Sequence, residues 1–436
     1  MTDPTTPIDR RTFLQGAGSL AAASLATSPS LANAQASAAG DAELRVALVG
    51  CGGRGTGAAV QALNTGNVRL VAMADAFTDR LEGSLSNISS RHPEKVDVPA
   101  ERRFVGFDAY RKAIDEDVDV VITATPPGFR PDHFDYAVSK GRHVFMEKPV
   151  AVDGPGIRKV LAAAEVAKEK KLCVGVGLQR HHSFKYQDTI RAIEDGAIGR
   201  PVLLRVYWNS GGVWVKPRQP QWNEMEYQMR NWYYFNWLCG DHIVEQHIHN
   251  LDVGNWVMGK TPIAAYGMGG RQVRRGSEHG EIYDHFAVEY EYDDGTRMMS
   301  QCRHQKEVWN SVSEHVHGSE GTCMVGRGQI ESYSGEKWRF DGQDSDHYQR
   351  EHVVLFDAIR TGREHNEAVN GAHATLTAIL GRMATYSGRK VTWQEALEST
   401  EVLAPEGALS WDSVPRSLPG ADGLYPIPTP GQYRVV

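Results

Sequence analysis

The stretch LRVALVGCGGRG, residues 44–55, decides the fold of this chain. Its first six residues form the short apolar run that is typical of a buried parallel strand. Gly50, Gly52 and Gly55 then match the pattern GxGxxG, and helix-like sequence follows over residues 56–63. In that setting the first glycine permits a tight turn, the second lets the backbone approach a pyrophosphate, and the third lets the helix pack on the strand. The stretch therefore predicts a dinucleotide-binding βαβ unit.

An acidic residue follows the second predicted strand. The apolar residues 68–74 end at Asp75, which lies 25 residues after the first glycine of the pattern. A carboxylate there accepts hydrogen bonds from the adenosine ribose and repels a 2'-phosphate, so it favours NAD over NADP. An acid after a strand can instead cap the next helix, which makes Asp75 weaker evidence than the glycines. The pyrophosphate would lie at the positive end of the first helix, beside Gly53 and Arg54.

Strands and helices continue to alternate as far as residue 177. We expect strands at 118–124, 143–146 and 172–176, with a helix around 131–139. This alternation predicts a doubly wound parallel sheet, which binds ligands at the carboxyl ends of its strands. The residues expected near those ends, and hence beside the cofactor, are Thr125, Pro126, His133, Glu147 and Lys148. Glu147 and Lys148 would then lie where the nicotinamide binds, although a surface ion pair is the alternative.

These motifs together resemble the Gfo/Idh/MocA oxidoreductases. The resemblance includes Thr125-Pro126 and Glu147-Lys148-Pro149, extends to Gln179-Arg180 and His249-x-x-Asp252, and covers roughly residues 43–390. It implies a Rossmann domain followed by an α/β domain with a large, open, mostly antiparallel sheet. It also implies NAD as cofactor with Gln179 beside it, a small carbohydrate as substrate, and a homo-oligomer formed through the second sheet.

The chain divides into five predicted parts. They are a signal peptide (1–34), an N-terminal arm (35–43), the dinucleotide-binding domain (44–177), the substrate-binding α/β domain (178–400) and a Pro/Gly-rich tail (401–436). The tail is either coil wrapped on the surface or an arm that reaches a neighbouring subunit. Elements expected in the second half are strands at 201–208, 263–269, 283–292, 296–303 and 311–317, and helices at 349–361 and 368–387.

The first 34 residues have the order of an export signal. Arg10 and Arg11 begin a twin-arginine pattern, residues 16–31 are mildly apolar, and residues 32–34 (Ala-Asn-Ala) form an A-x-A cleavage site. A frayed helix with two chance arginines is the alternative. The twin-arginine route exports folded proteins, so the pattern predicts a periplasmic location. Because free NAD is scarce outside the cytoplasm, the cofactor would remain tightly bound.

The segment 207–237 is rich in aromatic side chains and contains half of the ten tryptophans. Indole rings stack on the apolar faces of sugars, and interleaved polar side chains bind the hydroxyl groups. Core packing is the alternative for some of these rings. The candidate substrate residues from this segment are Trp214, Arg218, Arg230 and Trp232.

Residues 240–252 predict a helix that carries catalytic groups. Helical spacing places His242, Glu245 and His249 on one face. The family resemblance matches its catalytic histidine to His249, whereas Glu245 stands where the family has aspartate. A metal site built from these three residues is chemically possible. Nicotinamide chemistry explains the same residues, so we predict no metal.

The predicted roles follow from acid–base chemistry. His249 would act as general acid and base because its ordinary pKa lies near neutral pH, and Glu245 would orient it. Lys148 would stabilise negative charge on the reacting oxygen. Weaker candidates that would position the substrate are Gln179, Arg180, Tyr186 and His242.

Composition excludes several classes of protein. The formal net charge of −7 argues against sequence-independent binding of nucleic acid. No apolar run reaches the roughly 18 residues that a transmembrane helix needs. The five cysteines are scattered without a CxxC pair, which predicts buried thiols.

The sequence therefore predicts an exported NAD(P)-dependent oxidoreductase that moves a hydride between a sugar hydroxyl and a tightly held nicotinamide. One alternative is an NAD-dependent glycosidase that acts by transient oxidation, elimination, hydration and re-reduction. Others are a catalytically inactive sensor of NAD and sugar, and a cytoplasmic dehydrogenase that uses free NAD.

Overall fold

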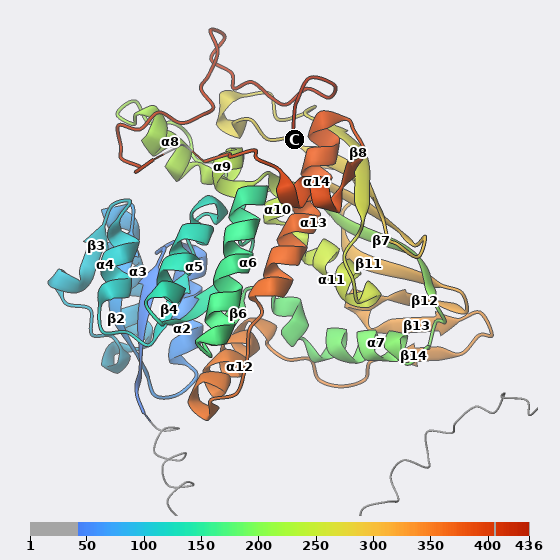
Figure 1. Ribbon diagram of the computed structural model, residues 1–436, viewed down its shortest axis with the longest axis horizontal. Helices are drawn as coiled ribbons and strands as arrows, with labels where there is room; N and C mark the ends of the chain where they lie inside the picture. Colours follow the sequence, from blue (N-terminus) through green and yellow to red (C-terminus); the bar gives the residue numbers. More distant parts are fainter. Residues whose placement is uncertain (1–41, 405–406, 436) are drawn as a thin grey trace, which may run out of the picture. The chain divides into compact units, whose positions relative to one another are not determined.

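A computed structural model describes residues 42–404 and 407–435. The predicted signal peptide and the first seven residues of the predicted arm lie outside the described residues. The described residues form one compact unit that contains two β-sheets (Figure 1). The sheets have six and nine strands.

The first sheet is parallel throughout, in the order β3-β2-β1-β4-β5-β6. Its strands are β1 (Leu44–Val49), β2 (Val68–Asp75), β3 (Arg103–Val105), β4 (Val120–Thr123), β5 (His143–Met146) and β6 (Val174–Val176). The strand order reverses between β1 and β4, which confirms the predicted doubly wound sheet. Such a reversal opens a crevice at the carboxyl ends of the strands.

Helices cover both faces of this sheet because β1 is apolar on both sides. Val46 and Leu48 belong to one buried cluster, and Ala47 and Val49 belong to the other. The helices that follow the strands are α2 (Gly53–Leu63), α3 (Thr78–Arg91), α4 (Ala109–Asp115), α5 (Arg130–Ser139) and α6 (Gly154–Glu169). Apolar residues of α2 and α3 join the first cluster, and those of α4, α5 and α6 join the second.

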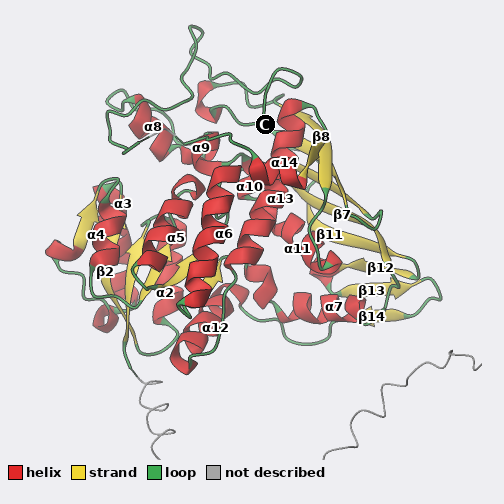
Figure 2. Ribbon diagram, in the orientation of Figure 1, coloured by secondary structure: helices red, strands yellow, loops and turns green. Residues whose placement is uncertain are grey.

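Two late helices tie the halves of the chain together. Helix α12 (His347–Thr361) packs against α2, and its Leu355 and Phe356 complete the first cluster. Helix α13 (Ala368–Ser387) contacts both α6 and the second sheet, and it lies between the two sheets (Figure 2). The core of the dinucleotide-binding half therefore includes residues far beyond position 177.

The second sheet is antiparallel except where β7 and β10 run parallel, in the order β14-β13-β12-β11-β7-β10-β9-β8-β15. Its strands are β7 (Pro201–Ser210), β8 (Ala264–Gly270), β9 (His285–Glu291), β10 (Arg297–His304), β11 (Ser311–Gly318), β12 (Gly321–Met324), β13 (Gln329–Ser332), β14 (Lys337–Arg339) and β15 (Val391–Thr392). This confirms the predicted large, mostly antiparallel sheet. The five predicted strands are all present, and β12 to β15 are additional.

The remaining helices are α7 (Phe184–Glu194), α8 (Glu224–Arg230), α9 (Asn236–Cys239), α10 (His242–Glu245), α11 (Ile248–Met258) and α14 (Trp393–Glu398). Helices α11 and α13 cover one face of the second sheet. In the described residues no helix combines the length and hydropathy needed to cross a bilayer. All five cysteines are buried and free, as predicted.

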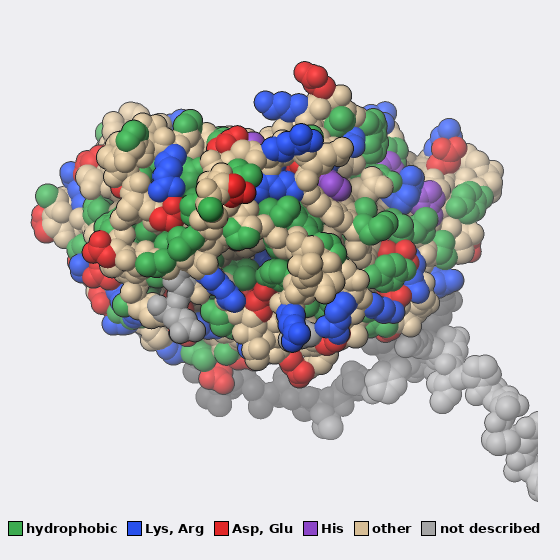
Figure 3. Space-filling view, turned by 90° about the horizontal axis from the view of Figure 1, so that it is seen from above, with side chains coloured by type: hydrophobic (Ala, Val, Ile, Leu, Met, Phe, Trp, Pro, Cys, Tyr) green, Lys and Arg blue, Asp and Glu red, His purple; other side chains and the backbone are tan. Residues whose placement is uncertain are grey.

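The tail packs on the segment between β7 and α10. The Gln228 amide donates to the Ser417 carbonyl at 2.7 Å, and the Asn223 amide donates to the Trp411 carbonyl at 2.7 Å. The described part of the tail therefore wraps around its own chain, above α8 and α9 in the view of Figure 1. On the face seen in Figure 3, acidic and basic side chains are interspersed.

Candidate functional site

Two adjoining cavities lie at the carboxyl edge of the first sheet. The first cavity has a volume of about 510 Å³, and the second has a volume of about 330 Å³. Both are lined by Arg54, Thr125, Trp214 and Trp232, so they form one continuous site. The first cavity is otherwise lined by the Rossmann half, Lys216 and α8, whereas the second also includes residues from α10, α11 and α12.

The glycines of the GxGxxG pattern make one wall of the first cavity. Gly50 has φ +95°, and a Cβ there would lie 2.6 Å from the carbonyl carbon of Ala124. A Cβ on Gly55 would lie 1.9 Å from the Gly50 carbonyl oxygen, so α2 packs directly on the turn. Gly52 faces open space at the start of α2. This open backbone cradle at a helix N-terminus fits a pyrophosphate.

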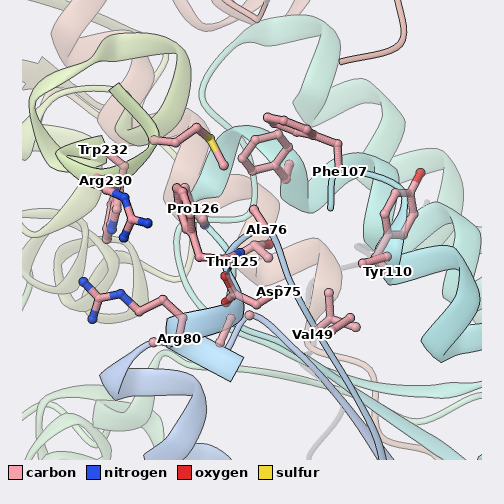
Figure 4. A pocket seen from close by; sticks show the side chains of 18 of the residues that line it. Val49, Asp75, Ala76, Arg80, Phe107, Tyr110, Thr125, Pro126, Arg230 and Trp232 are labelled. Atoms are coloured by element: carbon pink, nitrogen blue, oxygen red, sulfur yellow. Dashed lines mark hydrogen bonds between the residues drawn. The ribbon is translucent and has the colours of Figure 1, made fainter. Parts of the chain in front are cut away.

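Asp75 ends β2 and lines the first cavity (Figure 4). Its carboxylate accepts hydrogen bonds from the backbone N–H groups of Cys51 at 2.7 Å and Phe77 at 2.9 Å. Burial raises the pKa of Asp75, and these two donors oppose the increase. Each carboxylate oxygen retains acceptor capacity for a ribose hydroxyl. Arg80 and Arg230 lie together along one side of the same cavity.

His133 supports the first cavity as a neutral ring. It stacks on Tyr110 with ring centroids 4.1 Å apart, and its Nδ1 lies 3.2 Å from the Thr125 hydroxyl. Burial lowers the pKa of His133 to about 3, so the ring carries no charge at neutral pH. Thr125 and Pro126 also line this cavity, as the sequence predicted for the ends of the strands.

A buried arginine fixes the backbone between the two cavities. Arg130 donates to the carbonyls of Thr123 at 2.9 Å, Thr125 at 2.7 Å and Pro149 at 2.9 Å. It therefore joins the end of β4 to the turn that carries Lys148. Burial lowers its pKa to about 10, which leaves the guanidinium charged at neutral pH.

Lys148 and Glu245 form an ion pair in the second cavity. The Lys148 Nζ lies 3.0 Å from the Glu245 Oε1 and also donates to the Glu245 main-chain carbonyl. The two side chains are only 13% and 12% exposed. Burial raises the pKa of Glu245, and the Lys148 charge opposes the increase. This pair joins the Rossmann half to the second half at the place where both line the cavity.

His249 lines the same cavity as Lys148. Its ring stacks on Trp208 with centroids 6.0 Å apart, and its buried Nδ1 has no partner among the described residues. Burial and the nearby positive charges of Lys148 and Arg180 lower the pKa of His249 well below its ordinary value. The histidine is therefore neutral at physiological pH, which suits a proton acceptor. The sequence argument from the unperturbed pKa did not anticipate this shift.

Glu147 and Gln179 line the same cavity as Lys148 and His249. Glu147 forms an ion pair with the Arg54 Nε at 3.1 Å, and the Gln179 amide donates to the Tyr348 hydroxyl at 3.0 Å. Tyr348 belongs to α12, and the Arg54 guanidinium lies 5.3 Å from its ring centroid. Of the predicted cofactor residues, Gly55 supports the turn from behind, whereas Gly53 and the others line one or both cavities.

Four predicted substrate residues do not line either cavity. Arg180 forms an ion pair with the buried Glu314 of β11, and the Tyr186 hydroxyl donates to the same carboxylate at 3.2 Å. Arg218 pairs with Glu224 at 2.6 Å on the protein surface. The fourth, His242, has its Nδ1 2.9 Å from the carboxylate of the neighbouring Asp241. By contrast, the predicted substrate residue Arg230 does line the first cavity, where it pairs with Asp79 at 3.2 Å.

His242 does not reach the second cavity, and the segment that was predicted as one helix is broken after it. Helix α10 ends at Glu245, Gln246 has φ −117°, and α11 begins at Ile248. The prediction of one continuous helix over this segment is therefore wrong. The break keeps Glu245 and His249 in the second cavity, while His242 is completely buried against Asp241 at 2.9 Å.

Several residues of the second cavity escaped the sequence analysis as site residues. They are Arg130, Trp208, Tyr233, Gln246 and Tyr348. No motif marks them, although Trp208 and Tyr233 lie in the aromatic segment. Within the described ranges, no cluster of three or more His, Cys, Asp or Glu side chains could hold a metal ion.

A glycine cradle at the reversal of a doubly wound sheet, followed by a cavity with lysine and histidine, defines a nicotinamide-dependent oxidoreductase class. Residues 44–178 match the model of the oxidoreductase family with an NAD-binding Rossmann fold. Residues 186–324 match the GFO/IDH/MocA C-terminal domain. The chain belongs to the GFO/IDH/MocA family, and its first domain is an NAD-binding Rossmann domain.

Similar proteins of known activity include two inositol dehydrogenases. Scyllo-inositol 2-dehydrogenase (NAD(+)) of Bacillus subtilis is 24% identical over 221 residues, which cover 50% of this chain and 58% of the relative. Inositol 2-dehydrogenase of Rhizobium meliloti is 24% identical over 65% of this chain and 75% of the relative. Aldose-aldose oxidoreductase of Caulobacter crescentus, solved with glycerol, shares the fold with a TM-score of 0.64, at 18% identity over 80% of this chain and 100% of that one.

The glycine geometry makes a paired prediction. We expect Gly55→Ala to destabilise the fold by several kcal/mol, because its Cβ would overlap the Gly50 carbonyl oxygen. We expect Gly52→Ala to fold normally but to bind NADH at least about tenfold more weakly, because the methyl group fills the cradle. Thermal unfolding and NADH fluorescence measure the two effects. Gly83→Ala, at an exposed position of α3 with open space, is the control. A Gly55→Ala protein of unchanged Tm would contradict the first expectation.

Proposed function

We propose that this protein is an NAD-dependent oxidoreductase that moves a hydride between a hydroxyl-bearing carbon of a sugar or cyclic polyol and a tightly held nicotinamide. The observation that carries the proposal is that Lys148 and His249 both line the second cavity, which adjoins the first cavity with its glycine cradle for NAD. The inositol dehydrogenases among the relatives support a polyol substrate.

The residues of the second cavity suit this reaction. Bound NAD would supply the hydride acceptor, so the substrate carbon would lose a hydride, its hydroxyl would lose a proton, and the product would be a ketone. Neutral His249 accepts that proton, and the Lys148 ammonium stabilises negative charge that develops on the oxygen. Glu245 holds Lys148 in place through the ion pair, instead of orienting His249 as the sequence predicted. Reduction follows the same steps in reverse.

Removal of either central group tests the proposal. We expect Lys148→Ala and His249→Ala each to reduce turnover of myo-inositol by at least about a hundredfold, because each deletes a charge-stabilising or proton-transfer group. Formation of NADH at 340 nm measures the rate, and circular dichroism verifies the fold. The control is Lys140→Ala, which removes a half-exposed lysine paired with Asp115 on the surface. Near-normal turnover in both variants would reject the assignment of these residues.

The lowered pKa of His249 predicts the pH dependence. A base must be unprotonated to act, and burial keeps His249 neutral until the pH falls well below 6.5. We therefore expect kcat/KM for oxidation to show no acid-side inflection near about pH 6.5, the usual histidine value. Initial rates between about pH 5 and about pH 8 measure this profile. An inflection near 6.5 that His249→Asn removes would contradict the expectation.

The tail supports the proposal of a tightly held cofactor. Trp411 packs at a tilt against Phe77 and Phe107, with ring centroids 5.0 and 4.8 Å apart, and both phenylalanines line the first cavity. The Trp411 carbonyl is held by Asn223, next to α8. Helix α8 is tied in turn to α3 by the ion pair of Arg230. The tail and α8 thus enclose the cavity from the side opposite the sheet.

This enclosure predicts retention of NAD during purification. We expect the wild-type protein to carry about one NAD per chain after gel filtration, and Trp411→Ala to lose more than half of it, because the packing behind two cavity-lining rings is removed. Absorbance of the nucleotide released by denaturation measures the content. Val414→Ala, at a 68% exposed position of the same tail, is the matched control. Equal content in all three proteins would show that the tail does not retain the cofactor.

Export and assembly complete the proposal. The twin-arginine pattern supports export in the folded state to the periplasm, with the cofactor already bound. The face of the second sheet opposite α11 and α13 exposes Met268 at 79%, Met299 at 41% and Tyr266 at 38%. Apolar side chains gathered on an open sheet support a homo-oligomer formed through this face.

A further inference from the structure

Three side chains form a hydrogen-bonded chain that ends at the second cavity. The Arg274 Nη2 lies 2.5 Å from the His304 Nδ1, and the His304 Nε2 lies 2.8 Å from the Gln246 Oε1. Arg274 and His304 are only 4% and 3% exposed, and Gln246 lines the cavity. Arg274 is itself fixed, because its Nη1 donates to the Tyr283 carbonyl at 2.9 Å.

Arginine at the far end dictates the direction of every hydrogen bond in this chain. A guanidinium only donates, so the His304 Nδ1 must accept. Burial, together with the charges of His242 and Arg274, lowers the pKa of His304 well below its ordinary value. The neutral ring therefore carries its proton on Nε2 and donates to the Gln246 oxygen. The Gln246 amide nitrogen, with its two N–H groups, is left for the cavity.

Two further donors border the same cavity. The Trp208 Nε1 and the Tyr233 hydroxyl are buried and have no partner among the described residues, and both residues line the cavity. The Tyr233 ring also stacks on His304 with centroids 5.9 Å apart. An indole N–H can only donate, so its partner must be an acceptor. Buried donors without a partner are costly, and a bound oxygen atom removes that cost.

The cations at this cavity are already paired within the protein. Lys148 pairs with Glu245, and Arg54 pairs with Glu147. The third cation, Arg130, donates to three carbonyls. Each of these cations thus has partners within the protein, and the groups left for other parts of a substrate include the neutral donors of Gln246, Trp208 and Tyr233, which suit hydroxyl oxygens.

We propose that Gln246 determines specificity, because its amide nitrogen, with Trp208 and Tyr233, donates to a hydroxyl oxygen of a neutral sugar or cyclic polyol. This oxygen is distinct from the reacting one, which meets Lys148 and His249. The inference rests on the proposed function. A site built to hydrogen-bond a hydroxyl discriminates strongly against an analogue that lacks it, because the donors are then left unpaired.

Kinetics with paired ligands test the proposal. Gln246→Glu keeps the acceptor for His304 but replaces the amide donor with an acceptor oxygen. We expect it to raise KM for myo-inositol at least about tenfold, while kcat changes less than about threefold and NADH affinity is unchanged. The control is Gln394→Glu, at an exposed position of α14. A panel of monodeoxy-inositols adds a second comparison. In the wild type we expect one isomer, which lacks the hydroxyl bound by Gln246, to have a higher KM than myo-inositol. In Gln246→Glu we expect this difference in KM to disappear.

The outcomes separate this inference from the proposed function. If the wild type oxidises myo-inositol and Gln246→Glu has the same KM and the same deoxy preference, the role of Gln246 is overturned while the function stands. If the wild type neither binds nor oxidises myo-inositol or the deoxy panel, the polyol function fails, and the substrate contact of Gln246 fails with it.

The orientation of the amide has a test that needs no substrate. Nitrogen-15 shifts of His304 in the NAD-loaded protein report which ring nitrogen carries the proton, and substitution of His304 assigns the signal. Protonation at Nε2 supports the chain of bonds. Protonation at Nδ1 would turn the Gln246 oxygen toward the cavity and overturn the proposal.

Discussion

The buried ion pair between Lys148 and Glu245 is the constraint on which the site depends. Lys148 follows the last residues of β5, and Glu245 ends α10, almost a hundred residues later. Loss of one partner from such a pair typically costs about 3–5 kcal/mol, because the other charge is left buried. The two halves of the molecule must therefore meet at this point. Their meeting also closes the second cavity against the edge of the first sheet.

The same burial sets the protonation states around the pair. Desolvation disfavours every charged form, so it raises the pKa of Glu245 and lowers that of His249. Lys148 opposes the first effect and reinforces the second. One ammonium thus favours the charged form of the glutamate and adds to the burial that keeps the histidine neutral. This combination of groups is the one that removal of a proton from a hydroxyl requires.

Sequence patterns predicted the elements with strong local signals. The GxGxxG turn, the parallel sheet and the 20 residues of α13 follow from glycine spacing and apolar periodicity. The strands β12 to β15 have two to four residues each, too few for a periodic signal. The helix break at Gln246 also has no sequence signal, because no glycine or proline lies there. Helical spacing alone therefore placed His242 at the site, where only Glu245 and His249 belong.

The rest of the site depends on contacts between segments that lie far apart in the sequence. Arg180 follows β6, as in the family pattern, yet Glu314 from β11 binds it away from the cavity. Tyr348 lines the cavity only because α12 packs back against α2. No local pattern encodes either event. Both follow from how the second half folds over the first. The same folding lets Trp411, near the end of the chain, pack behind Phe77 and Phe107, which line the first cavity together with Val49, Gly50 and Gly52.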